Sequence, residues 1–207
     1  GELFRRYDAA MSEWMVVITA TLAVYGIMAI GGVSRGLNWL TEEADQTLLR
    51  LVITVLMPAL ILSNVLGNPA LQQPRNLIVP PLVGFASIML GFLVAGGLMF
   101  LLRKRRNFDK AVVRRTFVTS TGMYNYGYVP IPLIQALFDD RGTLGVLFVH
   151  NLGVDLAMWT VGVVVLSGGL TKGWYKRLLN PPTVTTLAAV VLNSVGAREY
   201  MPAFVMK

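Results

Sequence analysis

The chain has 207 residues, of which 55% are hydrophobic and 14% are charged. A soluble domain carries about 25% charged residues and needs more polar surface than this composition provides. Cysteine is absent, which excludes disulfides, thiolate metal sites and cysteine nucleophiles and leaves the redox compartment undetermined. The composition is that of an integral membrane protein of a plasma or inner membrane.

Six segments are long and apolar enough to cross a bilayer as helices, which takes about 20 residues. Five of them contain no charged residue, and the remaining one contains a single acid, Asp155. The segments are Trp14–Ser34, Leu51–Pro74, Asn76–Leu102, Thr116–Phe138, Gly142–Thr171 and Leu178–Ala197. The short alternating pattern of barrel strands does not occur. The sequence therefore predicts an all-α membrane protein with about six transmembrane helices.

The distribution of basic residues predicts the orientation, because positive charge stays on the cytoplasmic side. Twelve basic residues follow the first, third and fifth segments, and seven of these lie in the loop 103–115. The other side has five: Arg5, Arg6, Arg75, Arg141 and Arg198. We expect the N-terminal segment 1–13 outside and the loop 103–115 in the cytoplasm, near anionic membrane lipids. No nucleic-acid-binding motif accompanies the charge, so nucleic acid is not an expected partner.

The fourth segment cannot form one regular helix. Gly127, Pro130 and Pro132 lie close together in its middle, and prolines remove backbone donors while glycine is flexible. We expect two half-helices joined by an unwound stretch at Asn125–Pro132. Transporters bind solutes between such half-helix ends, where free backbone amides and helix dipoles receive ions. The alternative is a packing helix with a proline kink.

Three motifs carry a family resemblance. Asn125–Pro132 has the sequence Asn-Tyr-Gly-Tyr-Val-Pro-Ile-Pro, Met57–Leu62 is Met-Pro-Ala-Leu-Ile-Leu, and Leu179–Pro182 is Leu-Asn-Pro-Pro. They resemble the Asn-Thr-Gly-x-x-Gly-[Leu/Ile]-Pro, Leu-Pro-Ala-Leu-Leu-Phe and [Arg/Lys]-Asn-Pro-Pro segments of the auxin efflux carrier family. This family includes the plant PIN carriers and bacterial organic-anion permeases. The motifs occur in the family's order and spacing, so the resemblance covers the whole chain.

The resemblance implies an architecture of ten helices in two inverted five-helix repeats, whose unwound fourth and ninth helices cross at the substrate site. On this basis residues 14–171 are the first repeat. Residues 172–207 begin the second repeat with a sixth helix and a truncated seventh. We therefore expect the chain to be the N-terminal half of a carrier and the sequence to be a fragment.

The resemblance also implies a substrate site. Asn125 matches the crossover asparagine that contacts the substrate carboxylate, and Gly127 and Pro132 match the family's glycine and final proline. Pro130 replaces the family's usual glycine, and Tyr126 replaces its threonine, so the shape of the pocket differs. The expected substrate-binding residues are Asn125, Tyr126, Gly127, Tyr128, Pro130 and Pro132.

Asp155 is a second candidate, because a carboxylate inside a membrane span is costly without a partner or a function. Asn151 lies four residues earlier on the same helix face, and His150 adjoins it. The three are candidates for coupling proton movement to transport. Alternatively, a neutral Asp155 holds two helices together, and His150 is simply interfacial. Three residues of the second segment are candidates for lining the cavity: Ser63, Asn64 and Pro58. Alternatively, the two polar residues join helices and Pro58 is a structural kink.

These observations predict a secondary-active transporter of small organic anions, such as auxin-like acids or carboxylates, that works by alternating access. One alternative is a sodium-coupled symporter of the bile-acid type. Another is a non-transporting membrane subunit, if the chain ends at Lys207; a carrier of that length would need a homodimer to complete its site. An enzyme is not expected, because one histidine and one intramembrane acid supply no catalytic constellation. No cofactor, metal or catalytic residue is predicted.

Overall fold

The computed structural model describes residues 2–105, 108–138, 141–169 and 172–196. Within these ranges the chain is helical and contains no strand. The α-helices are α1 (Glu2–Gly36), α2 (Glu42–Leu51), α3 (Met57–Val65), α4 (Pro74–Leu102), α5 (Ala111–Gly122), α6 (Pro130–Leu137), α7 (Arg141–Ala157), α8 (Val163–Ser167) and α9 (Pro181–Ser194). The π-helical turns are η1 (Val52–Leu56) and η4 (Met158–Gly162), and the 3-10 turns are η2 (Pro69–Gln72) and η5 (Trp174–Leu178).

Four continuous helical segments among the described residues are long and apolar enough to cross a membrane. They are Trp14–Gly36, Glu42–Val65, Pro74–Leu102 and Gly142–Ser167, which correspond to the first, second, third and fifth predicted spans. The fourth predicted span is divided between α5 and α6, and the sixth corresponds to α9, with 14 residues. The prediction of an all-α membrane protein is confirmed.

The most extensive helix–helix contact is between α4 and α7. Glycines allow these two helices to approach closely: a Cβ on Gly84 would meet the carbonyl oxygen of His150, and one on Gly153 would meet that of Pro81. Two turns further along α4, Gly91 meets the backbone of Gly122 in α5. Small residues have this role in membrane helices, where close backbone packing replaces the hydrophobic effect. Helices α4, α5 and α7 thus form one closely packed group.

A second group consists of α3 and α9, which pack against each other and also touch α7. Their shared core contains Ile61 and Val65 of α3, Phe148 of α7 and Ala189 of α9. At one end, the side chain of Asn193 accepts a hydrogen bond from the N–H of Gly67 at 2.7 Å. It also donates one to the carbonyl of Asn68 at 3.3 Å. These bonds join the end of α9 to the loop that follows α3.

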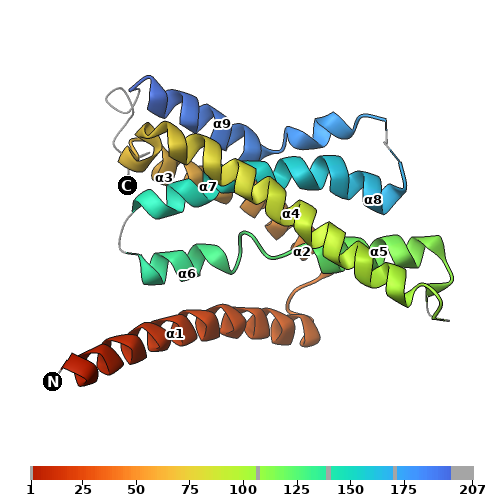
Figure 1. The fold of residues 1–207 in the computed structure, drawn as a ribbon, viewed down its shortest axis with the longest axis horizontal. Coiled ribbons are helices and arrows are strands. Elements are labelled where there is room, and N and C mark those ends of the chain that lie inside the picture. Colours follow the sequence, from red (N-terminus) through yellow and green to blue (C-terminus); the bar gives the residue numbers. More distant parts are fainter. Residues whose placement is uncertain (1, 106–107, 139–140, 170–171, 197–207) are drawn as a thin grey trace.

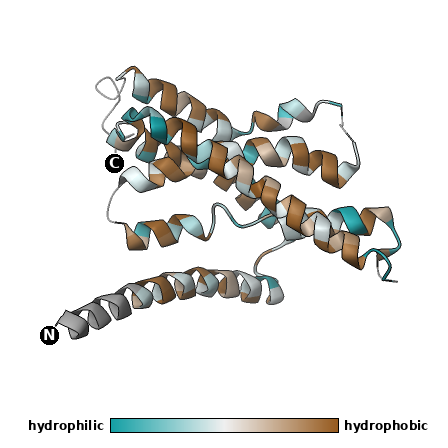
Figure 2. Cartoon of the chain, viewed as in Figure 1, coloured by the Kyte–Doolittle hydropathy of each residue, from teal (hydrophilic) through white to brown (hydrophobic). Residues whose placement is uncertain are grey.

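Helix α1 lies apart from both groups and contacts the rest of the molecule mainly through α6 (Figure 1). Figure 2 shows hydrophobic residues along the length of α4 and α7 and a concentration of hydrophilic ones where α4 is followed by α5. Arg115 of α5 reaches the carbonyl of Ser167 at 3.2 Å, so the end of α8 lies at the same end of the molecule. A cation beside the last carbonyls of a helix also complements its dipole.

Candidate functional site

The unwound part of the fourth span comprises residues 123–129, which lie between α5 and α6 and are called the crossover below. The sequence predicted the bounds Asn125–Pro132, which wrongly included Pro130 and Pro132. Both prolines belong to the first turn of α6. Proline is favourable there, because the N–H it lacks would have no helical partner in the first turn. The interruption is therefore present, but it lies two to three residues earlier than predicted.

Hydrogen bonds attach the crossover to α4 and α7. The hydroxyls of Tyr124 and Ser87 in α4 lie 2.9 Å apart and share a hydrogen bond. The hydroxyl of Tyr126 donates to Oδ1 of Asp155 at 3.2 Å. The side-chain amide of Asn151 donates to the backbone carbonyl of Tyr126, also at 3.2 Å. An irregular backbone at this depth needs such partners, because lipid supplies none.

Asn125 shapes the crossover from within. Its Oδ1 accepts hydrogen bonds from the N–H groups of Gly127 and Val129, each at 3.3 Å. The first bond forms a local turn, and the second satisfies an N–H at the beginning of α6. The side-chain NH2 group of Asn125 makes no hydrogen bond to any residue that the structure describes, nor do the backbone N–H groups of Tyr126 and Tyr128. The crossover therefore presents several unused donors.

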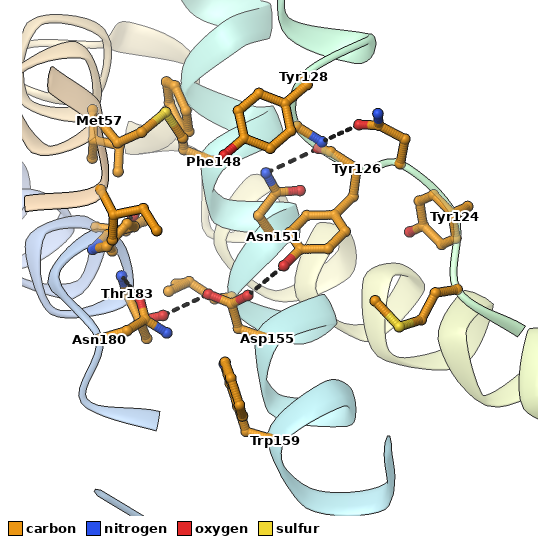
Figure 3. Close-up of a pocket in the computed structure, with 18 residues that line it drawn as sticks. Met57, Tyr124, Tyr126, Tyr128, Phe148, Asn151, Asp155, Trp159, Asn180 and Thr183 are labelled. Atoms are coloured by element: carbon orange, nitrogen blue, oxygen red, sulfur yellow. Dashed lines mark hydrogen bonds between the residues drawn. The ribbon is translucent and has the colours of Figure 1, made fainter. Parts of the chain in front are cut away.

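A cavity of about 570 Å³ lies between the crossover and the two helix groups, and Figure 3 shows its lining. One wall is the crossover, with Tyr124 to Tyr128. A second wall comes from α7 and η4, and a third from η1, α3 and the beginning of α9. The lining residues outside the crossover include Ile53, Met57, Ile61, Phe148, Asn151, Leu152, Asp155, Trp159, Asn180, Pro182, Thr183 and Thr186. The cavity is mostly apolar, with a few polar groups, as binding sites for small molecules usually are.

Asp155 joins three elements around this cavity. Besides the bond from Tyr126, its Oδ2 accepts a hydrogen bond from the hydroxyl of Thr183 in α9 at 2.5 Å. The side chain of Asn180 donates a further one. Asn180 also caps α9, because its Oδ1 accepts from the N–H of Thr183 at 2.9 Å. Figure 3 shows Asp155 between Tyr126 and Thr183. The carboxylate thus joins the crossover and α7 to the start of α9.

The structure brings together six of the predicted site residues at the cavity: Asn125, Tyr126, Gly127, Tyr128, Asn151 and Asp155. It places the other six outside the lining: Pro130, Pro132, His150, Ser63, Asn64 and Pro58. Ser63 and Asn64 bond to the carbonyl of Leu60 within their own helix. His150 contacts the side chain of Asn151 at 3.1 Å, so it adjoins the site indirectly.

Sequence reasoning missed Thr183, Asn180 and Trp159. Asn180 belongs to the motif Leu179–Pro182, but no local pattern shows that it lies beside Asp155. The two π-helical turns were also missed, because they have the same hydropathy as an α-helix. Each provides a lining residue, Ile53 from η1 and Trp159 from η4, and π turns often occur at functional sites. A threonine in each turn bonds to the carbonyl four residues earlier, which bends helices.

Within the part of the chain that the structure describes, no group of three or more histidines and acids is close enough to hold a metal ion. Every polar contact of Asp155 given above is with a neutral side chain.

Comparison with known proteins places this geometry in context. Residues 16–169 match the family model described as membrane transport protein. An uncharacterized transporter of Methanothermobacter thermautotrophicus is 27% identical over 178 residues, which cover 84% of this chain and 57% of that protein. An uncharacterized transporter of Methanocaldococcus jannaschii is 26% identical over 201 residues, covering 93% of this chain and 63% of that protein. The chain thus spans about three fifths of the length of these relatives. No solved structure matches it significantly.

The family match covers most of the chain, from the first long helix to the end of the fifth span. Both relatives are named uncharacterized transporters, and the family model is that of membrane transport proteins, so the comparisons indicate a transport protein family and not an enzyme family. The apolar helices indicate an integral membrane protein. The chain belongs to the membrane transport protein family, the auxin efflux carrier-like family that its motifs resemble.

Proposed function

We propose that this chain is the first half of a secondary-active carrier that moves small organic acids, as anions, across the membrane by alternating access. Residues 14–171 form one five-helix repeat, and residues 172–207 begin the second. The loop 103–115 faces the cytoplasm and the N-terminus lies outside. In this proposal, the acid group of the solute binds at the crossover.

The observation that carries the proposal is the set of unused donors on the crossover. The NH2 group of Asn125 and the N–H groups of Tyr126 and Tyr128 lack partners among the described residues, and all three residues line the cavity. Backbone N–H groups in an irregular turn can act together as a site for an anion, and here those of Tyr126 and Tyr128 flank the bonded N–H of Gly127. A carboxylate oxygen can accept several such bonds at once.

The position of the cavity supports alternating access. It lies where the α4–α5–α7 group meets the α3–α9 group, and both groups contribute to its lining. Movement of one group against the other would change the access to a solute held at this boundary. The hydrogen bond between Asp155 and Thr183 crosses the boundary, so it would open or re-form during such a movement.

The test is uptake of a panel of radiolabelled mono- and dicarboxylic acids into proteoliposomes that contain the full-length protein. The most informative variant is Asn125→Asp. It keeps an oxygen for the N–H groups of Gly127 and Val129 but loses the NH2 donor and adds a charge that repels the anion. We expect uptake to fall at least about tenfold, since a hydrogen bond to a charged group contributes about 1.5–3 kcal/mol.

The matched control is Asn38→Asp, because it adds the same charge at an exposed position between the first two spans and outside the cavity lining. It should retain uptake. Undiminished uptake by the Asn125→Asp variant would disprove the site assignment. Replacing external sodium by choline distinguishes this carrier from a sodium-coupled symporter of the bile-acid type, for which uptake would stop.

A further inference from the structure

The charge of the cavity is unbalanced. Asp155 is the only lining residue of the described cavity with a formal charge, and no lysine, arginine or histidine is among the lining residues. The three side chains that bond to Asp155 are neutral: Tyr126, Thr183 and Asn180. These donors replace part of the water that the carboxylate loses, but they supply no opposite charge. A carboxylate in a membrane span usually has a partner or a task.

The carboxylate still has room for one more donor. An ionised carboxyl group offers about four lone-pair sites, and the three neutral side chains occupy three of them. An ammonium group is a compact donor of up to three hydrogen bonds and carries the missing charge. Because Asp155 faces the cavity, a solute can deliver such a group directly.

The walls near Asp155 also suit a cation. Trp159 lies one helical turn further along the same span, and both residues line the cavity (Figure 3). Tyr124 and Tyr126 pack edge to face with their ring centroids 6.4 Å apart, and Tyr128 lines the same wall. Aromatic faces attract cations, tryptophan most strongly, and the attraction is greater where water is excluded.

We infer that the cavity binds solutes that carry a protonated amino group as well as an acid group. The ammonium pairs with Asp155 beside Trp159, and the acid group binds the donors of Asn125 and the crossover. The apolar part of the solute packs against the aromatic and methionine side chains. This inference rests on the proposed function for the acid group and adds a second, cationic end to the substrate.

The test is binding of three probes that share a phenylethyl skeleton to the full-length protein in detergent, measured by isothermal titration calorimetry. Phenylalanine carries both charged groups, 3-phenylpropionate carries only the acid, and 2-phenylethylamine carries only the amine. We expect phenylalanine to bind at least about tenfold more tightly than either single-charge probe, a difference of about 1.4 kcal/mol. Uptake of labelled phenylalanine into proteoliposomes should follow the same order.

The Asp155→Asn variant assigns the ammonium to this residue. The hydroxyls of Tyr126 and Thr183 can accept as well as donate, so an amide fits between them without loss of the fold. We expect phenylalanine binding to weaken at least about tenfold and 3-phenylpropionate binding to stay within about twofold. Retained 3-phenylpropionate binding shows that the variant is folded. The variants Trp159→Leu and Trp159→Phe provide a second measurement, in which only the leucine should weaken phenylalanine binding markedly.

The outcomes separate the two proposals. If 3-phenylpropionate binds the wild-type protein as tightly as phenylalanine, the second charge is not recognised and this inference is wrong, while the proposed acid carrier stands. If 2-phenylethylamine alone binds, the inference and the proposed acid site are both wrong. Binding of none of the three probes overturns the inference, and the organic-acid panel then decides the proposed function by itself. Unchanged phenylalanine binding by the Asp155→Asn variant also overturns the inference.

Discussion

The first and the fifth spans are both long apolar helices, yet the molecule uses them differently. In the most apolar stretch of Trp14–Gly36, no residue is buried within the described molecule. In the most apolar stretch of Gly142–Ser167, 33% of the residues are buried. Helix α1 contacts the rest mainly through α6, while α7 contacts α3, α4 and α9. The span with more polar residues is therefore the better packed one. In a membrane, apolarity places a helix in lipid, and specific contacts determine where it packs.

Glycine illustrates the same contrast. A Cβ added to Gly26, Gly31 or Gly32 in α1 would meet nothing within 4 Å. A Cβ added to Gly145 or Gly153 in α7 would overlap atoms of the neighbouring elements. The same residue type is thus permissive in one helix and necessary in the other. Substitutions in the two helices should reveal this difference directly.

The largest effect is expected at Gly153. Its alanine variant would place a Cβ against the backbone carbonyl of Pro81, which cannot move without separating α7 from α4. We expect the free energy of unfolding, measured in mixed detergent and SDS, to fall by about 1–3 kcal/mol. The control is Gly31→Ala, which should leave it unchanged or raise it slightly. Equal effects of the two variants would refute the contrast between the helices.

An intermediate effect is expected for the hydrogen bond that joins α7 to α9. The Thr183→Val variant keeps the shape of the side chain and removes the donor to Asp155. Because hydrogen bonds between membrane helices contribute about 0.6–1.7 kcal/mol, we expect a loss of about 1 kcal/mol in the unfolding free energy. Thr185→Val, two residues further along α9 and outside the cavity lining, should have little effect. A loss as large for Thr185→Val would mean that the Asp155 bond contributes no specific stability.

The smallest effect is expected at the polar end of α1. Arg35 forms exposed ion pairs with Asp45 at 3.1 Å and with Glu42 at 3.4 Å. Exposed pairs contribute about 0–1 kcal/mol and are weakened by salt. The Arg35→Gln variant should therefore lose less than about 1 kcal/mol at low salt, and the difference should vanish at about 1 M salt. A larger or salt-independent loss would show that α1 is fixed to the molecule more firmly than its contacts indicate.

Local patterns predicted the features that local chemistry determines. Runs without charge predicted the long spans, and Gly127 with two nearby prolines predicted the interruption of the fourth. The predicted bounds of the interruption were wrong because the effect of proline depends on its position in a helix. Pro130 is unfavourable in a helix interior, so it cannot continue α5, but it is favourable in the first turn of α6.

The candidate site was predicted in part. Asn125 and Asp155 stood out because polar and irregular residues are expensive inside a membrane. Thr183 did not, because a threonine near a helix start is ordinary and its contact spans 28 residues of sequence. Local patterns reveal which residues need a partner, but tertiary packing decides which partner each one finds.

The π-helical turn at Met158–Gly162 has a consequence for comparing genes. Such a turn holds one residue more than an α-helical turn, so it is equivalent to a single-residue insertion that the helix has absorbed. Deleting one residue there would restore regular winding and leave the helix beyond it in nearly the same orientation, because only the bulge is removed. Arg115 would then still meet the carbonyl of Ser167. When homologous genes are aligned, a one-residue gap at this turn thus marks a local change in the cavity wall, where Trp159 lies.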